Sequence, residues 1–146
     1  MNCAGIDLQT GAAAEVGFER GIQSVEPLLS PPSDLPYLAP GFIDLQVNGF
    51  AGVDYNSPST PHDEIARSLE ALFASGVTRV FPTVITGSPD DMAGALRNLA
   101  AAKETLKLGG ALEAFHVEGP HICPDDGPRG AHPRQWVRPP DLEEFR

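Results

Sequence analysis

The residues that could do chemistry gather in one stretch, Phe115 to His132 (FHVEGPHICPDDGPRGAH). Glu118 ends an apolar run, and Gly119 and Pro120 follow it at once, so a stiff turn would leave the carboxylate free to bind a divalent cation. His132 lies further on in RGAHP, where a glycine allows close backbone approach and a proline fixes the chain beyond it. Such residues make this stretch a candidate edge of a site that binds a divalent cation.

Each of these residues also has a simpler interpretation when it is taken alone. A single Glu118 at a strand end fits a surface or capped carboxylate. We expect His116 to be a hydrogen-bonded core histidine, and His121 to be a loop histidine without a role in the site. The basic side chains nearby either help to bind a sugar phosphate or, as we expect, are solvated charges that balance acidic neighbours (Arg129, Arg134 and Arg138).

Strands that alternate with helices would position these residues. We expect strands at 39–49, 78–86 and 111–118, because each is an apolar or alternating run bounded by turn residues. Two helices lie between them, each with the same start signal of a hydroxyl, a proline and an acidic residue (Thr60-Pro61-His62-Asp63 and Ser88-Pro89-Asp90-Asp91). Gly76 ends the first helix and Gly109-Gly110 the second, and Pro139 onward resembles the first turn of a third.

This order predicts an α/β fold with a parallel sheet and right-handed crossovers. Asp44, Gln46 and Asn48 share one face of the first strand, and His116 and Glu118 share one face of the third. In a parallel (β/α)8 TIM-type barrel, functional groups sit at the carboxyl ends of strands, but such a barrel takes about 250 residues. We therefore expect a partial barrel made of its first three strands, in a chain that is a fragment.

The residues before the barrel segment differ from it in composition. The residues from Gly5 to about Leu29 form short runs broken by glycines, which indicates strands and turns of a small sheet. The proline-rich Ser30 to Pro36 is a connector. We expect residues 1–36 to be part of a small β-sandwich domain with its connector, and residues 37–146 to be the first β/α units of the barrel.

Composition narrows the class of protein and its partners. The chain has 146 residues, with 10 basic against 20 acidic side chains and a net charge of −10, which argues against nucleic-acid binding. Its two cysteines, Cys3 and Cys123, form no disulfide framework. No basic, apolar leader begins the sequence, and it has no run of about 18 apolar residues. We expect a cytoplasmic protein with no membrane partner.

The motifs in combination are more specific than any one residue. Together they resemble the N-acetylglucosamine-6-phosphate deacetylases of the amidohydrolase superfamily, well from Tyr37 onward and more loosely before it. The segments that carry the resemblance are PGFIDLQVNG (Pro40 to Gly49), NGFAGVDYN (Asn48 to Asn56), GVTRVFPTVIT (Gly76 to Thr86), HVEGP (His116 to Pro120) and RGAHP (Arg129 to Pro133).

The resemblance implies roles for several residues. The metal-ligand glutamate of the family falls on Glu118, and the substrate-contacting Gly-Ala-His segment falls on Ala131 and His132, with the imidazole at the N-acetyl carbonyl. Many amidohydrolases carry a His-x-His pair where this chain has Gln46 and Asn48. Amides bind a transition metal poorly, so this departure, itself typical of single-metal deacetylases, argues against a dinuclear site.

The implied reaction is metal-dependent hydrolysis of the N-acetyl amide of N-acetylglucosamine 6-phosphate, giving glucosamine 6-phosphate and acetate in amino-sugar catabolism. One divalent ion, zinc or iron, would serve as cofactor, and the full-length enzyme could be a homodimer. The family's general base, a late aspartate, and two histidine ligands are expected downstream, so we assign no catalytic residue within this chain and expect it to be inactive alone. Two alternatives stay open: a related amidohydrolase acting on another N-acyl or cyclic amide, and a non-catalytic truncated remnant.

Overall fold

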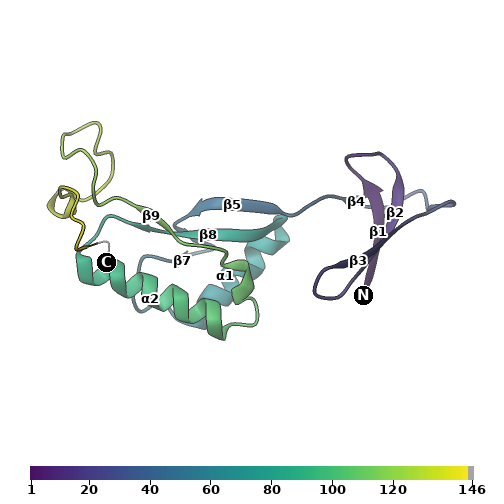
Figure 1. Cartoon of the computed structure of the whole chain (residues 1–146), viewed down its shortest axis with the longest axis horizontal. Coiled ribbons are helices and arrows are strands. Elements are labelled where there is room, and N and C mark those ends of the chain that lie inside the picture. The colour runs from purple at the N-terminus through teal and green to yellow at the C-terminus, as the bar shows by residue number, and fades with distance from the viewer. Residues whose placement is uncertain (145–146) are drawn as a thin grey trace. The chain divides into compact units, whose positions relative to one another are not determined.

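The computed structural model of the chain describes residues 1–144 and divides into two compact units, residues 1–40 and 41–146. The first unit is a four-stranded sheet, and the second contains both α-helices and a parallel sheet (Figure 1). The expected mixed α/β class is therefore observed. Within the described residues, neither helix is long and apolar enough to cross a membrane.

The sheet of the first unit has the strand order β3-β2-β1-β4. Its strands are β1 (Asn2–Asp7), β2 (Ala13–Phe18), β3 (Ile22–Pro27) and β4 (Tyr37–Leu38). The first three pair antiparallel in sequence order, whereas β4 pairs parallel with β1. Tyr37 and Leu38, which the sequence assigned to the second domain, therefore pair within the first unit.

The second unit is built on three parallel strands in the order β5-β8-β9. The strands are β5 (Phe42–Val47), β8 (Val77–Ile85) and β9 (His116–Glu118). Helix α1 (His62–Ala74) connects β5 to β8, and α2 (Pro89–Thr105) connects β8 to β9. Short elements complete the unit: β6 (Gly49–Phe50), β7 (Val53–Asp54) and the 3-10 helices η1 (Gly109–Ala111) and η2 (Arg134–Trp136).

The two helices begin differently, although their sequences carry the same start signal. Ser88 caps α2 as expected, since its hydroxyl accepts a hydrogen bond from the Asp91 amide at 3.1 Å. Thr60 does not cap α1, and that expectation was wrong. Its hydroxyl donates instead to the Asp54 carbonyl at 2.6 Å, and the residue that precedes the helix is Pro61, which makes no side-chain cap. The carbonyl of β7 thus satisfies the buried hydroxyl.

The segment between α2 and β9 also differs from the expectation. Gly109 does not close α2, which ends at Thr105, but opens η1, where the chain passes so close to the Lys103 carbonyl that a Cβ would overlap it. The third strand is shorter than 111–118: β9 begins at His116, and Leu112, which is fully buried in the core, makes only an isolated bridge to Val80. Gly76 ends α1 as predicted, with a φ of +89°.

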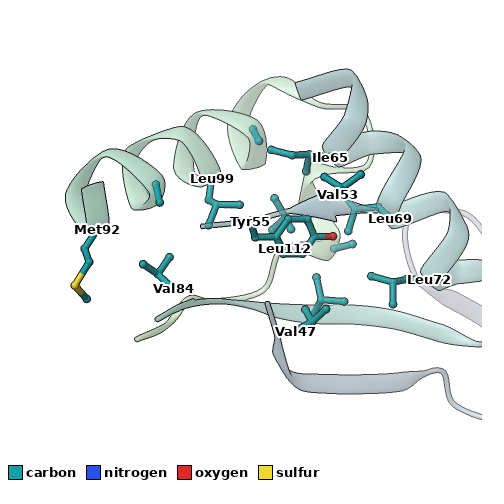
Figure 2. Packing of buried hydrophobic residues seen from close by; sticks show 14 residues of the cluster. Val47, Val53, Tyr55, Ile65, Leu69, Leu72, Val84, Met92, Leu99 and Leu112 are labelled. Carbon is teal, nitrogen blue, oxygen red and sulfur yellow. The ribbon is translucent and has the colours of Figure 1, made fainter. Parts of the chain in front are cut away.

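A single hydrophobic core lies between the helices and the sheet. In Figure 2, Ile65, Leu69 and Leu72 of α1 and Leu99 of α2 point toward the sheet side of the unit, where Val47 and Val84 lie. Tyr55 is buried among them, and its hydroxyl lies 2.6 Å from that of Ser68. This core fixes the strands whose ends carry the polar residues.

An exposed apolar edge strand and a C-terminal turn mark two margins of the second unit. β5 is an edge strand of the described sheet and exposes apolar side chains, with Phe42 at 69%, Ile43 at 55% and Leu45 at 61%. The predicted third helix is a turn at 142–144, where Asp141 Oδ1 accepts from the Glu143 amide at 2.9 Å. Any continuation past Glu144 lies outside the described residues.

Candidate active site

The carboxyl ends of the three parallel strands bring together polar residues that are far apart in the sequence. Gln46 lies near the end of β5, Glu118 ends β9, and Thr86 directly follows β8 between them. The Gln46 side-chain amide donates to Glu118 Oε2 at 2.8 Å and so reaches past the central strand. This meeting follows from parallel pairing, which places all carboxyl ends at one edge of the sheet.

The other carboxylate oxygen of Glu118 faces His132. His132 Nε2 lies 3.3 Å from Glu118 Oε1, and the exposed fractions of the two side chains are 16% and 35%. Glu118 is therefore held from both sides, by an amide and by an imidazole. A carboxylate with partners on both oxygens has a fixed orientation, which is what a ligand or a charged anchor in a site needs.

A buried hydroxyl holds the opposite edge of the imidazole. His132 Nδ1 lies 2.8 Å from Thr86 Oγ1, and the same hydroxyl lies 3.3 Å from the backbone carbonyl oxygen of Glu118. Thr86 is only 3% exposed. Gln46, Glu118, His132 and Thr86 thus form one connected polar network, which we call the strand-end network.

Arginines hold the loop that carries His132. Arg129 donates to the His132 carbonyl at 2.6 Å and to Asp126 Oδ1 at 2.6 Å, and its side chain is 19% exposed. Arg129 therefore balances an acidic neighbour, as expected, but its side chain is largely buried rather than solvated. Its guanidinium bridges two parts of the loop because planar, forked donors can serve a carbonyl and a carboxylate together.

Arg138 is likewise hydrogen-bonded within the protein rather than solvated. It donates to the Gly87 carbonyl at 3.0 Å, to the Trp136 carbonyl at 2.7 Å and to Glu144 Oε2 at 2.9 Å. The hydrogen bond between Arg138 and the Glu144 carboxylate lowers the pKa of Glu144 and raises the pKa of Arg138. Arg134, in contrast, is exposed, as expected.

An open hollow of about 280 Å³ lies beside the strand-end network. The sequence-predicted site residues Glu118, Ala131 and His132 all line it. Gln46 and Asn48, where a histidine pair was considered, line it too, together with Ile85. The structure therefore brings the predicted residues to one place, next to a space that could hold a small molecule.

The remaining histidines of this region make hydrogen bonds of their own. His116 Nδ1 donates to the Leu45 carbonyl at 3.1 Å, so it is hydrogen-bonded as expected but half-buried rather than in the core. His121 is not an isolated loop histidine: its side chain is 10% exposed, with Nδ1 3.3 Å from the Arg138 carbonyl and Nε2 3.7 Å from Glu144. Neither ring lies within the hollow beside Glu118.

A complete metal site is not present in the part of the chain that the structure describes. Among residues 1–144, no three histidine, cysteine, aspartate or glutamate side chains gather in a way that could hold a metal ion. Glu118 and His132 come close to each other, but transition-metal sites usually use about three protein ligands. The described residues fit a portion of such a site and not the whole.

Sequence reasoning missed Thr86 and Asn56. Asn56 Oδ1 accepts from the Ile85 amide at 2.7 Å, and its Nδ2 donates to the Asn48 carbonyl at 3.3 Å, so it joins the end of β5 to the end of β8. Thr86 could have been found, because the strand-end argument applied to Asn48 and Glu118 holds equally for a polar residue after the second strand. Asn56 carried no such signal.

Comparison with solved structures shows that the chain has the fold of part of the deacetylases named below. The N-acetylglucosamine-6-phosphate deacetylase of Thermotoga maritima superposes on 99% of this chain with a TM-score of 0.75 and 26% identity. A mutant deacetylase of Mycobacterium smegmatis, solved in complex with N-acetyl-D-glucosamine-6-phosphate, does so with a TM-score of 0.71 and 25% identity. The chain covers 39% of each of these proteins. No family model matches the sequence.

Curated relatives narrow the class to a particular family. The N-acetylglucosamine-6-phosphate deacetylase of Caenorhabditis elegans is 44% identical over 104 residues, which are 68% of this chain and 24% of the relative. That of Bacillus subtilis is 32% identical over 144 residues, 97% of this chain and 35% of the relative. The chain is homologous to the N-acetylglucosamine-6-phosphate deacetylases, as the motifs predicted, and spans between a quarter and about two fifths of their length.

Proposed function

We propose that this chain supplies the metal-ligand edge of an N-acetylglucosamine-6-phosphate deacetylase, which hydrolyses the N-acetyl amide to glucosamine 6-phosphate and acetate. The observation that carries the proposal is the joining of Glu118 and His132 beside one hollow, in a chain whose relatives bear that name. The substrate is an amino-sugar phosphate, and the enzyme works as a cytoplasmic protein.

The proposed architecture is the beginning of a (β/α)8 barrel. Three parallel strands joined by two helices are the repeating unit of that fold. The exposed apolar side chains of β5 support the proposal, because a barrel strand has neighbours on both sides and packs its remaining face against other elements. The four-stranded sheet of residues 1–40 would belong to the small β-domain that accompanies the barrel.

The proposed cofactor is one divalent ion, zinc or iron, with Glu118 as a ligand and the other ligands outside residues 1–144. A bound ion would polarise the scissile carbonyl and lower the pKa of a water molecule. Gln46 donates a hydrogen bond to Glu118 and so orients its carboxylate. Gln46 and Asn48 offer amides where a second transition-metal ion would need imidazole ligands, which favours one ion over two.

His132 is the proposed partner of the N-acetyl carbonyl, with Ala131 beside it. Its Nε2 lies 3.3 Å from Glu118 Oε1 and both residues line the hollow, so a hydrogen on that nitrogen could be donated to a carbonyl oxygen that gains negative charge. The hydrogen bond from Arg129 to the His132 carbonyl holds the loop in place for this contact. Binding and orientation are therefore the tasks of this part of the enzyme.

A chimera tests the proposal. Residues 41–144 would replace the matching segment of the Bacillus subtilis deacetylase, and the purified protein would be assayed for acetate release and for metal content. We expect deacetylation, with about one metal ion per active site. Glu118→Gln should reduce both the metal content and the activity at least about tenfold, as loss of a ligand or its support does, whereas the exposed Glu104→Gln should change neither.

Two results would contradict parts of the proposal, and a third would contradict only the incompleteness of the site. A folded chimera that releases no acetate would exclude the function, and full metal content in Glu118→Gln would remove Glu118 from the ligand set. The isolated chain of 146 residues should show no turnover with added zinc or ferrous iron, because its described residues lack a complete ligand set. Turnover by that chain would overturn the incomplete-site argument.

A further inference from the structure

The histidine at the hollow lies on an irregular loop, and a loop by itself does not fix a ring. A functional side chain must be held within about 0.5 Å of its working position by neighbours with locked conformations. The buried neighbour on the far side of the His132 ring is Thr86, with Oγ1 2.8 Å from Nδ1 and only 3% of the residue exposed. Thr86 directly follows β8, the central strand, so its backbone is set by the sheet.

We propose that Thr86 is a positioning residue: its hydroxyl donates to Nδ1 of His132 and so directs a hydrogen-bearing Nε2 toward Glu118 and the hollow. The proposal names no new contact with the substrate. Thr86 acts entirely through His132, and the role rests on the proposed function, in which Nε2 meets the N-acetyl carbonyl.

The hydrogen count supports this arrangement. A threonine hydroxyl has one hydrogen, and it can go to His132 Nδ1 at 2.8 Å or to the Glu118 carbonyl at 3.3 Å. A neutral imidazole has one hydrogen as well, and the Glu118 carboxylate 3.3 Å from Nε2 favours it on that nitrogen. Nδ1 is then an acceptor, and the closer of the two possible hydrogen bonds of Thr86 satisfies it.

The backbone beside Thr86 leaves room for its hydroxyl. Gly119 has a φ of +81°, and a Cβ built there would overlap Thr86 Oγ1. A side chain at position 119 would therefore displace the hydroxyl from its place between the imidazole and the Glu118 carbonyl. The turn after β9 thus provides the space that the hydroxyl occupies, independently of the distance between Thr86 and His132.

Threonine is suited to this task because its side chain is branched at Cβ. Two heavy atoms on Cβ restrict χ1, so the hydroxyl has a defined direction from the backbone that directly follows β8. The contact joins residues 46 positions apart, a loop histidine and a threonine next to the strand end, in a partly buried setting. Its loss would free the ring to turn without disturbing the strands.

Nuclear magnetic resonance of the whole chain tests the proposal without metal or substrate. Imidazole ¹⁵N shifts, recorded at a pH where the rings are neutral, show which nitrogen of His132 bears hydrogen and whether the other accepts a hydrogen bond. We expect hydrogen on Nε2 and an accepting Nδ1. In Thr86→Val, the population with Nε2 directed at Glu118 should fall about fivefold relative to other ring orientations, which corresponds to about 1 kcal/mol for one hydrogen bond.

Two further variants separate positioning from general damage. Thr86→Ser keeps the hydroxyl and should restore the wild-type His132 signals. Thr83→Val removes another buried hydroxyl of β8, which donates to the Phe81 carbonyl and not to His132, and should leave those signals unchanged. The signals of His62, His116 and His121 report on the fold in every variant.

The outcomes are decisive in both directions. Hydrogen on Nδ1 in the wild-type chain, or unchanged His132 signals in a folded Thr86→Val, would overturn the proposal. If Thr86→Val does not fold, two measurements still test the proposal: the position of the hydrogen on His132 in the wild-type chain, and the His132 signals of Thr86→Ser, which should match those of the wild type. An inactive chimera would refute the proposed function and leave the anchoring of His132 intact, so the two failures are distinguishable.

Discussion

Replacing Arg138 with methionine should release the loop that follows β9. The guanidinium of Arg138 joins three segments: the end of β8 through the Gly87 carbonyl, η2 through the Trp136 carbonyl, and the turn at Glu144. Its side chain is 23% exposed and that of Glu144 is 25% exposed, so water screens these contacts only in part. Methionine keeps a long apolar stem but donates nothing.

The size of the effect follows from these contacts. Two hydrogen bonds from a charged donor to carbonyls contribute about 1.5 kcal/mol each, and a partly exposed ion pair contributes about 0.5 to 1 kcal/mol. Because contacts of one side chain are not additive, we expect the free energy of local opening to fall by about 2 to 4 kcal/mol. That is roughly a 30- to 700-fold increase in the fraction of open loop.

Hydrogen exchange measured by mass spectrometry would detect this change. Peptides from 119–140 should exchange faster in Arg138→Met by that factor, up to the rate of an unprotected chain, while peptides from α1 keep their protection. The control is Arg134→Met in the same loop, since Arg134 is exposed. Unchanged exchange in 119–140 would refute the reasoning, and equal acceleration in α1 would show that Arg138 supports the whole unit rather than the loop.

Further predictions concern pH and the core. The pKa of Glu144 is lowered in the folded chain, so its contribution to loop protection should be present above the ordinary glutamate pKa. This contribution should be lost as pH falls through the lower folded value. Hydrogen exchange at a series of pH values should show the loss in the wild-type chain and not in Arg138→Met. Leu99→Ala should lower the free energy of unfolding by about 2 to 5 kcal/mol in urea titrations, because Leu99 is 1% exposed, and a loss under about 1 kcal/mol would contradict its place in the core. Burial raises the pKa of Tyr55, so ultraviolet titration should show this phenol ionising at higher pH in the folded chain than in the chain unfolded by urea, with the stability it adds fading as pH rises through the folded value. Equal midpoints for this phenol in Tyr37→Phe, folded and unfolded, would contradict the prediction.

Periodicity predicted the elements better than their ends. The apolar spacing of α1 and α2 and the apolar run of β8 follow from burial in one core, and both patterns can be read in the sequence. The cap of α1 was predicted wrongly because the Thr60 hydroxyl can either accept a hydrogen bond from the first turn of the helix or donate one elsewhere. In the structure it donates to the Asp54 carbonyl, a partner outside the helix. Likewise, the strand expected from 111 begins only at His116, because before it the chain forms η1 and a single isolated bridge from Leu112 to Val80.

In the candidate site, too, features set by neighbouring residues in the sequence could be predicted, whereas contacts between distant residues could not. Glu118 and His132 could be singled out by the turn and loop residues around them, which are local in sequence. The partners that orient them, Gln46 and Thr86, lie on other strands, and which side chains meet at the sheet edge depends on register. The arginines of the loop were misjudged for a related reason, because a charged residue in a sequence gives no sign of the carbonyls that will surround it.

Glu118 decides how much of the proposed chemistry this chain can hold by itself. Its carboxylate has a donor at Oε2 in Gln46 and an imidazole at Oε1 in His132, so the described residues orient it completely without any ion. The same residues offer no cluster of three possible ligands. Orientation is thus local to the first three strands, whereas tight metal binding requires ligands that the described part of the chain does not bring to Glu118. A carboxylate that is oriented before the ion arrives needs less rearrangement on binding. We therefore expect Glu118→Gln to weaken the metal site of the chimera. The fold of residues 41–144 should stay intact in this variant.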